Sequence, residues 1–207
     1  MTLEQRRLRP VLLLATCLAL LTACAPGGPF NDREAPVGPH VPTGPASSLT
    51  PHRGEGQTVD LEGAGTLVVP EGSTVEDTID MGDGGRQLNI RMPGADDEGL
   101  PALQASWGPD HVGVFEQTLT SQHAASVNPT MSDYVRSMVQ WPGSAESVVA
   151  TWEEDIALTD GSTLPVSALR LTVQGDDAVT VVVLALAPRG ELDGSAVEQA
   201  LRSLELD

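Results

Sequence analysis

Residues 179–187 read Val-Thr-Val-Val-Val-Leu-Ala-Leu-Ala and are apolar at odd and even positions alike. Successive side chains of a strand point to opposite faces of its sheet, so this run predicts a strand that is covered on both faces. Two longer segments precede it, Ser147–Leu158 and Leu164–Gln174, and the turn residues Thr159-Asp160-Gly161-Ser162 join them. They predict a long hairpin.

Shorter strands are expected earlier in the chain. Leu67–Val69 stops at Pro70, and the segments Val75–Met81 and Arg86–Met92 flank a glycine-rich turn that suits a tight hairpin. In the second segment apolar and polar residues alternate, so we expect one buried face and one solvent-exposed face. The side chains expected to be buried are Leu88, Ile90 and Met92, and those expected to be exposed to solvent are Gln87, Asn89 and Arg91. The same alternation recurs at Leu103, Ala105 and Trp107.

Helices are expected before and after the long hairpin. Asp110 is placed to cap the first of them, and a capping box of Ser195 and Glu198 opens another at the C-terminus. The apolar stripes are Val112, Phe115 and Leu119 in the first helix and Val197, Leu201 and Leu204 in the last.

A further short helix is expected after Thr130, because Met131, Tyr134, Val135 and Met138 recur at helical spacing. The order of strands and helices predicts an α+β fold, an antiparallel sheet flanked by helices, over residues 58–207. A segment of about 150 residues suffices for one domain with its own core.

The N-terminus predicts an export signal. Three arginines precede Val11–Leu21, an apolar run of eleven residues that is too short to span a membrane. The run ends in Leu21-Thr22-Ala23-Cys24, the pattern of a bacterial lipobox, in which the Cys24 thiol receives diacylglycerol. An ordinary signal peptide with a chance cysteine is the alternative, but no other cysteine follows Cys24. We therefore expect cleavage after residue 23 and acyl chains, palmitate among them, that anchor the protein to the extracytoplasmic face of the cell membrane.

Residues 24–57 predict a tether. Seven prolines and six glycines fall within Ala25–Gln57, together with few apolar side chains. Such a segment cannot bury enough surface to offset its ordering entropy. We expect a disordered linker that holds the domain clear of the membrane.

The charge excludes one class of partner. The chain has 29 acidic residues and 11 basic ones, all arginine, for a formal net charge of −18. Removing residues 1–23 takes away three arginines and one glutamate and leaves −20. Nucleic-acid binding requires a basic patch that releases counterions from phosphate, so no nucleic-acid partner is expected.

The domain offers few groups for catalysis or metal binding. Its histidines are His111 and His123, within or beside the expected first helix, and it has no G-x-S-x-G turn. Zinc requires three or four converging ligands, and no acidic cluster has the spacing of an EF-hand. We expect a non-enzymatic protein without a metal or cofactor.

The order of elements resembles the PsbP-like α/β/α sandwich, a fold class that includes actinobacterial lipoproteins of the LpqN type. The residues that carry the resemblance are Val68–Gly72, the strand pair around Asp160-Gly161, Val181–Leu186 and Ala200–Leu204. The sequence departs from the pattern in an acidic loop at 93–100 and near Trp141. The resemblance implies a domain that docks to partners or ligands, and no catalytic motif transfers with it.

Five residues are candidates for binding. Asp96, Asp97 and Glu98 form an acidic loop, and Trp141, which precedes Pro142-Gly143 outside any clear strand, is expected to be exposed. Glu154 shares the parity of apolar neighbours in its strand. It therefore either lies at a β-bulge or a sheet edge, or serves as a pocket carboxylate that faces a cationic ligand.

Two functions fit these observations. The first is a module that docks an envelope protein with a basic face, through Asp96-Asp97-Glu98 and Trp141. The second is a carrier of a small ligand or cation in a pocket between sheet and helices, with Glu154 or the acidic loops supplying charge. A cavity with apolar walls around a carboxylate favours the carrier, whereas an exposed Trp141 favours docking.

Overall fold

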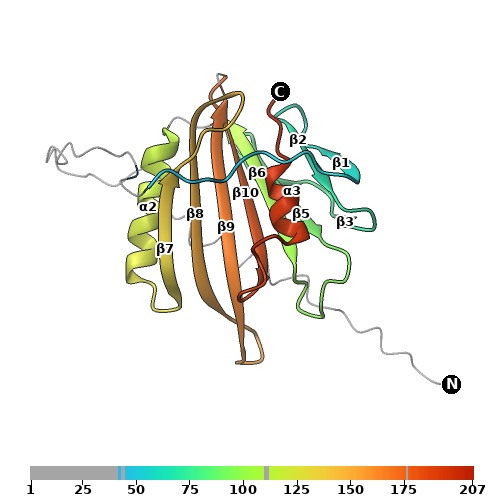
Figure 1. Cartoon of the computed structure of the whole chain (residues 1–207), viewed down its shortest axis with the longest axis vertical. Coiled ribbons are helices and arrows are strands. Elements are labelled where there is room, and N and C mark those ends of the chain that lie inside the picture. Colours follow the sequence, from blue (N-terminus) through green and yellow to red (C-terminus); the bar gives the residue numbers. More distant parts are fainter. Residues whose placement is uncertain (1–41, 43–44, 110–111, 176) are drawn as a thin grey trace, which may run out of the picture.

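The computed structural model describes residues 42, 45–109, 112–175 and 177–207, so the lipobox residues lie outside the described part. One antiparallel sheet of eight strands dominates, and the described part contains two helices, which confirms the predicted α+β class. The strand order, drawn in Figure 1, is β3 (Thr74–Val75), β5 (Gly85–Arg91), β6 (Ala102–Pro109), β10 (Val179–Pro188), β9 (Thr163–Gly175), β8 (Ser144–Ala157) and β7 (Met131–Met138), with β4 (Ile79–Gly82) paired to β5. Among the described helices, neither is long and apolar enough to cross a membrane.

The central strand is β10, between β6 and β9. Val181, Val183 and Ala185 pack into a core on one face of the sheet, and Leu184 and Leu186 pack into a second core on the other. The predicted burial on both faces is confirmed. The long hairpin is confirmed as well, because β8 and β9 pair from Ser144 to Ala157.

The larger core lies on the sheet face that carries α3 (Ala196–Arg202), here termed the α3 face. A separate ribbon of β1 (Gln57–Asp60) and β2 (Thr66–Val69) helps to close it. Val197, Leu201 and Leu204 are buried as predicted.

The predicted N-cap of α3 is also confirmed. The backbone N–H of Glu198 donates to Ser195 Oγ at 3.2 Å. The Glu198 carboxylate in turn accepts from the Gly194 N–H, one residue before the capping serine. Ser195 thereby satisfies one of the free N–H groups in the first turn, and Glu198 fixes the residue that precedes the cap.

The opposite face of the sheet, the α2 face, is covered in part by α2 (Val114–Val127), which packs on β7, β8 and β9. This helix differs from its prediction. It begins after Gly113, which supplies no side-chain cap, and the expected cap, Asp110, lies outside the described residues. The fully buried side chains are Val114, Thr118 and Ala125 rather than the predicted stripe.

A polar anchor explains the orientation of α2. The Arg136 guanidinium, on β7, donates from Nη1 to the Phe115 carbonyl at 2.8 Å and to Thr118 Oγ1 at 3.1 Å. These bonds hold the Thr118 side of the helix against the sheet. A hydrophobic periodicity contains no information about such a bond.

The short helix expected after Thr130 is wrong, because residues 131–138 form the edge strand β7. A bulge lies between Ser132 and Val135, with Asp133 at φ 54°. The extra residue places Met131 and Tyr134 three positions apart on the same face, where both pack against the second core. A β-bulge therefore produced the spacing that suggests a helical turn.

The first predicted hairpin needs two corrections. The segment Val75–Met81 is divided into β3 and β4, although β4 and β5 do form the expected hairpin. Gln87 and Asn89, which are expected to be exposed to solvent, are only 5% and 9% exposed. They remain satisfied in part because Asn89 Oδ1 accepts from Gln104 Nε2 at 2.9 Å.

Residues 45–53, which were predicted to be part of the disordered tether, form a strap across the α3 face (Figure 1). The Ser47 N–H donates to the Met138 carbonyl at 2.8 Å, and Arg202 Nε donates to the Thr50 carbonyl at 2.8 Å. Leu49 packs against the larger core. The prediction is wrong for this part, because the strap finds partners far away in the sequence. Residues 24–41 and 43–44 of the predicted tether lie outside the described residues.

Candidate functional site

A groove of about 640 Å³ lies on the α3 face between the edge strand β7 and the connection from β10 to α3. Val149 and Thr151 of β8 and Leu169 of β9 form its floor. The strap closes the end near Met138, where Ser47, Ser48 and Leu49 line it. The groove thus combines an apolar floor with polar walls, which is typical of small-molecule sites.

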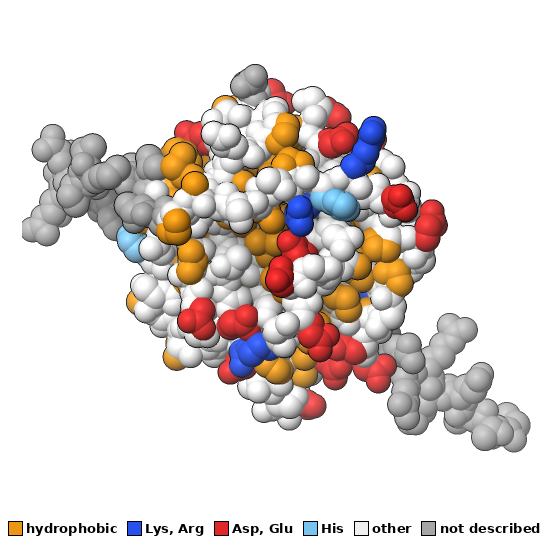
Figure 2. All heavy atoms as spheres, in the orientation of Figure 1, with side chains coloured by type: hydrophobic (Ala, Val, Ile, Leu, Met, Phe, Trp, Pro, Cys, Tyr) orange, Lys and Arg blue, Asp and Glu red, His pale blue; other side chains and the backbone are white. Residues whose placement is uncertain are grey.

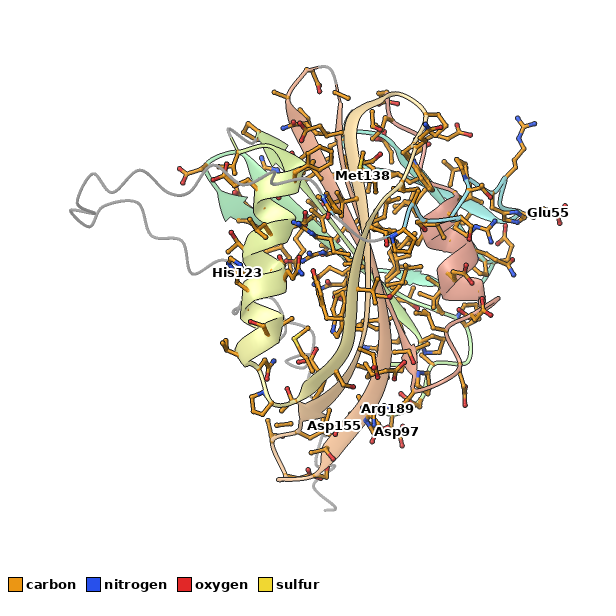
Figure 3. All side chains as sticks on the ribbon, turned by 60° about the vertical axis from the view of Figure 1, so that its left-hand side comes forward. Glu55, Asp97, His123, Met138, Asp155 and Arg189 are labelled. Carbon is orange, nitrogen blue, oxygen red and sulfur yellow. The ribbon has the colours of Figure 1, made fainter. Side chains whose placement is uncertain are left out.

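An ion-pair network closes the other end of the groove. Arg189 donates to Glu153 at 3.0 Å and to Asp155 at 2.9 Å. The second Glu153 oxygen accepts from Ser167 Oγ at 2.7 Å. Figure 3 shows the Asp155 and Arg189 side chains close together at this end of the sheet. Both Glu153 oxygens are therefore occupied within the protein.

The wall formed by α3 carries a second internal pair. Glu198 lies 3.6 Å from Arg202 Nη1, and its other oxygen accepts the Gly194 N–H of the helix cap. Arg202 also holds the strap through the Thr50 carbonyl. This pair fixes the wall and the strap together.

Two further carboxylates line the groove from opposite sides. Asp133 comes from the bulge in β7, and Asp193 comes from the connection between β10 and α3. Both are exposed, and neither makes a hydrogen bond or ion pair to any described residue through its carboxylate. Figure 2, which views this face, shows acidic side chains interspersed with apolar ones and few basic groups. The groove therefore has free negative charge above an apolar floor.

Trp141 is not at this site, and the expectation that it is exposed is wrong. Its side chain is 5% exposed, and Nε1 donates to the Leu204 carbonyl at 3.1 Å. The connection from β7 to β8 packs there against the end of α3. This contact links positions 63 residues apart, so no local pattern indicates it.

The predicted acidic loop stays at the surface and does not line the groove. Asp96 Oδ1 accepts the Leu100 N–H at 2.7 Å and so holds its own turn. Asp97 and Glu98 are exposed. Asp96 is exposed as well, so the loop presents three acidic side chains to solvent, and one of them also holds the turn.

Glu154 also lies outside the groove. It is half-buried on the α2 face, where its carboxylate accepts the Trp152 indole N–H at 3.1 Å. Its strand is not an edge, and the neighbouring bulge is in β7 rather than in β8. The indole donor, rather than a bulge or an edge position of its own strand, accounts for a carboxylate at this position.

Sequence reasoning missed the groove carboxylates. The spacing of residues 131–138 predicts a helix around Asp133, and Asp193 lies in a loop segment with no motif. A weak signal for Asp133 exists, because Asp is one of the few residues that adopt the left-handed backbone conformation found at this bulge.

The described residues contain no group of three or more His, Cys, Asp or Glu side chains arranged to hold a metal ion. His123 is exposed and projects from α2 (Figure 3). His111 lies outside the described residues.

Comparisons with known proteins leave the chain without a family. No family model and no curated protein matches it. A crystal structure of a protein from Bacteroides thetaiotaomicron aligns with 74% of this chain at 16% identity and a TM-score of 0.34. The chain covers 49%, about half, of that protein.

Proposed function

We propose that the protein is a lipid-anchored, extracytoplasmic binding protein without enzymatic activity, and that its groove takes a small organic cation. The observation that carries the proposal is the pair of free carboxylates, Asp133 and Asp193, on opposite walls of an apolar floor. An ammonium group at either wall gains a charge-assisted hydrogen bond to Asp133 or Asp193, while an attached hydrocarbon portion lies over the floor near Val149 and Leu169. The remaining groove charges are already paired within the protein.

The proposal is tested by calorimetric titration of the mature chain carrying Cys24→Ser, which cannot be acylated. Hexylammonium should bind, and 1-hexanol, with the same hydrocarbon chain and no charge, should bind much more weakly. Changing Asp133→Asn and Asp193→Asn together should reduce hexylammonium affinity by about tenfold, or about 1.4 kcal/mol. Asparagine tolerates positive φ at position 133, so the bulge is retained.

Asp97→Asn is the matched control, because it removes an exposed carboxylate outside the groove and should leave the affinity unchanged. Equal hexylammonium affinity in the double variant and in the parent contradicts the proposal. So does an absence of hexylammonium binding by the parent.

Docking of an envelope protein with a basic face is the second candidate. The observation in its favour is the exposed pair Asp97 and Glu98, in a mature chain with a charge of −20. Such a surface attracts basic partners in a salt-dependent manner. Changing Asp97→Asn and Glu98→Gln together should slow association more than it speeds dissociation.

We also propose the PsbP-like sandwich as the fold family. The arrangement of α2 and α3 on opposite faces of the sheet supports it. An experimental structure with a different strand order contradicts this assignment.

A further inference from the structure

The α2 face carries a row of aligned polar side chains that the groove does not use. Pairing registers place one residue from each of six strands side by side across the sheet. From β7 to β5 the row is Arg136, Ala150, Arg170, Leu184, Gln104 and Asn89. Two arginine side chains and two amide side chains thus lie in one row on the α2 face, and all four are buried.

Arg170 has the most unusual environment in this row. It is 5% exposed, and its guanidinium carbon lies 5.9 Å from the centre of the Trp152 ring. Its Nη2 donates to Tyr134 Oη at 3.3 Å, a long bond to a neutral group. Its Nε has no hydrogen-bond partner. No ion pair to Arg170 occurs among the described residues.

A buried guanidinium of this kind is costly. It has five N–H donors, and the removal of its charge from water is compensated only when an anion or several acceptors replace the water. Desolvation lowers the pKa of Arg170, with an opposing contribution from Tyr134. The guanidinium nevertheless stays charged, because its pKa lies so high to begin with.

The neighbours of Arg170 on this face of the sheet are small, and they are buried with it. Its lateral neighbour on β8 is Ala150, and its neighbours along β9 on the same face are Ala168 and Thr172. Arg136, on the other side of Ala150, is a second arginine on this face, and its guanidinium is bonded to α2. Small side chains therefore surround the Arg170 guanidinium.

Further along the face, amides supply additional donors and acceptors. Asn89 Oδ1 accepts from Gln87 Nε2 at 3.3 Å and from Gln104 Nε2 at 2.9 Å. The Oε1 atom of Gln87 is buried and has no partner. The unpartnered Gln87 Oε1 thus lies on the same face of the sheet as the unpartnered Arg170 Nε.

We propose that Arg170 binds the anionic group of a ligand, a carboxylate or a phosphate, on the α2 face of the sheet. The Nε–H and one terminal N–H of the guanidinium form a fork that matches two oxygens of such a group. Tyr134 provides a hydroxyl beside the site, and the Trp152 ring supports the guanidinium from one side. This site is separate from the acidic groove and takes a ligand of opposite charge.

The test compares probes of one chain length on the mature chain carrying Cys24→Ser. Hexanoate and hexyl phosphate should each bind and raise the melting temperature with concentration. Inorganic phosphate distinguishes two kinds of natural ligand. If it binds as tightly as hexyl phosphate, the ligand is a free phosphate ion. If it binds more weakly, the ligand is an amphiphile that carries the anionic group. An absence of binding by all three anions overturns the proposal.

Arg170→Met removes the charge and keeps the length of the side chain. We expect it to weaken anion binding at least tenfold while the ligand-free melting temperature stays equal or rises, because an unpaired buried charge has been removed. Arg91→Met is the matched control, since Arg91 lies on the same face of the sheet but is exposed. Anion affinity that is unchanged in Arg170→Met overturns the proposal.

A measurement on the unmodified side chains covers the case in which Arg170→Met does not fold. The Nε–H resonance of Arg170 should shift downfield on titration with hexanoate, and an unchanged resonance overturns the proposal. Asp133→Asn with Asp193→Asn should leave the hexanoate affinity unchanged, and Arg170→Met should leave the hexylammonium affinity unchanged. The failure of one site is thereby distinguishable from the failure of the other.

Discussion

At the scale of single residues, Trp141 shows how one side chain joins two parts of the domain. Its indole fills the space beside the end of α3 and satisfies the Leu204 carbonyl. A carbonyl near a helix end has no partner within the helix, so this bond replaces one to water. Asp80 plays a comparable role at the surface, where it accepts the Gly82 N–H at 2.9 Å and pairs with Arg86 at 2.9 Å.

Trp141→Ala should destabilise the domain by about 3–5 kcal/mol, because it leaves a cavity and an unpaired carbonyl. Trp141→Phe keeps most of the ring volume and should cost less. Urea unfolding of both variants measures the difference. A loss below about 1 kcal/mol for Trp141→Ala contradicts the buried position.

The hydrogen bond from Gly82, followed by the charge of Arg86, holds the pKa of Asp80 below its ordinary value of 3.8. A depressed pKa stabilises the folded state above the ordinary value, and this contribution is lost as pH falls through the lowered pKa. Asp80→Asn should therefore reduce stability at pH 7 and leave it unchanged near pH 2. NMR titration of the carboxyl carbon checks the midpoint, and a midpoint at or above 3.8 contradicts the pairing.

At the scale of elements, the strap and α3 depend on each other. The His52 N–H donates to the Arg202 carbonyl at 2.7 Å, and the Arg202 side chain bonds Thr50. A few residues further on, the backbone packs closely against β2. A Cβ at Gly56 would lie only 2.1 Å from the Val69 carbonyl oxygen, so the position requires glycine. The strap is thus attached to α3, and the residues just after it lie against β2.

Limited proteolysis should stop upstream of Pro45 rather than at Gln57, because the backbone of the strap is hydrogen-bonded to the domain. Mass spectrometry of the resistant fragment locates the boundary. Arg202→Met should move the boundary toward Gln57 by releasing Thr50. A wild-type fragment that begins at Gln57 contradicts the attachment of the strap.

Leu201 lies at the centre of the α3 contact and is fully buried. Leu201→Ala should reduce the free energy of unfolding by about 2–5 kcal/mol. Gln199→Ala, at an exposed position of the same helix, is the control and should have little effect. A melting temperature for Leu201→Ala within a degree or two of the wild-type value shows that α3 is not docked.

At the scale of the whole molecule, the proposed anchor and the charge act together. A mature chain with a charge of −20 is repelled by anionic headgroups, so an anchored domain should stand away from the membrane. The groove would then open to the solution rather than to lipid.

Cys24→Ser should abolish acylation and leave the protein either uncleaved or released. Metabolic labelling with a fatty-acid probe, followed by membrane fractionation, measures this outcome. Cys17→Ser is the control, because Cys17 lies in the segment that cleavage removes. Label that persists in Cys24→Ser refutes the anchor.

Patterns of short range in the sequence determined the central strand, the long hairpin and the capped C-terminal helix. In each case neighbouring residues carry the whole signal: apolar residues at both parities in β10, the turn residues 159–162 between β8 and β9, and a serine three residues before a glutamate. Only the tertiary structure decided the bulge at Asp133, the strap and the burial of Trp141. Each depends on a partner distant in the chain, and a local period contains no information about such a partner. The groove belongs to this second class, because its two walls face each other only when β7 and the connection after β10 take their places beside β8 and β9.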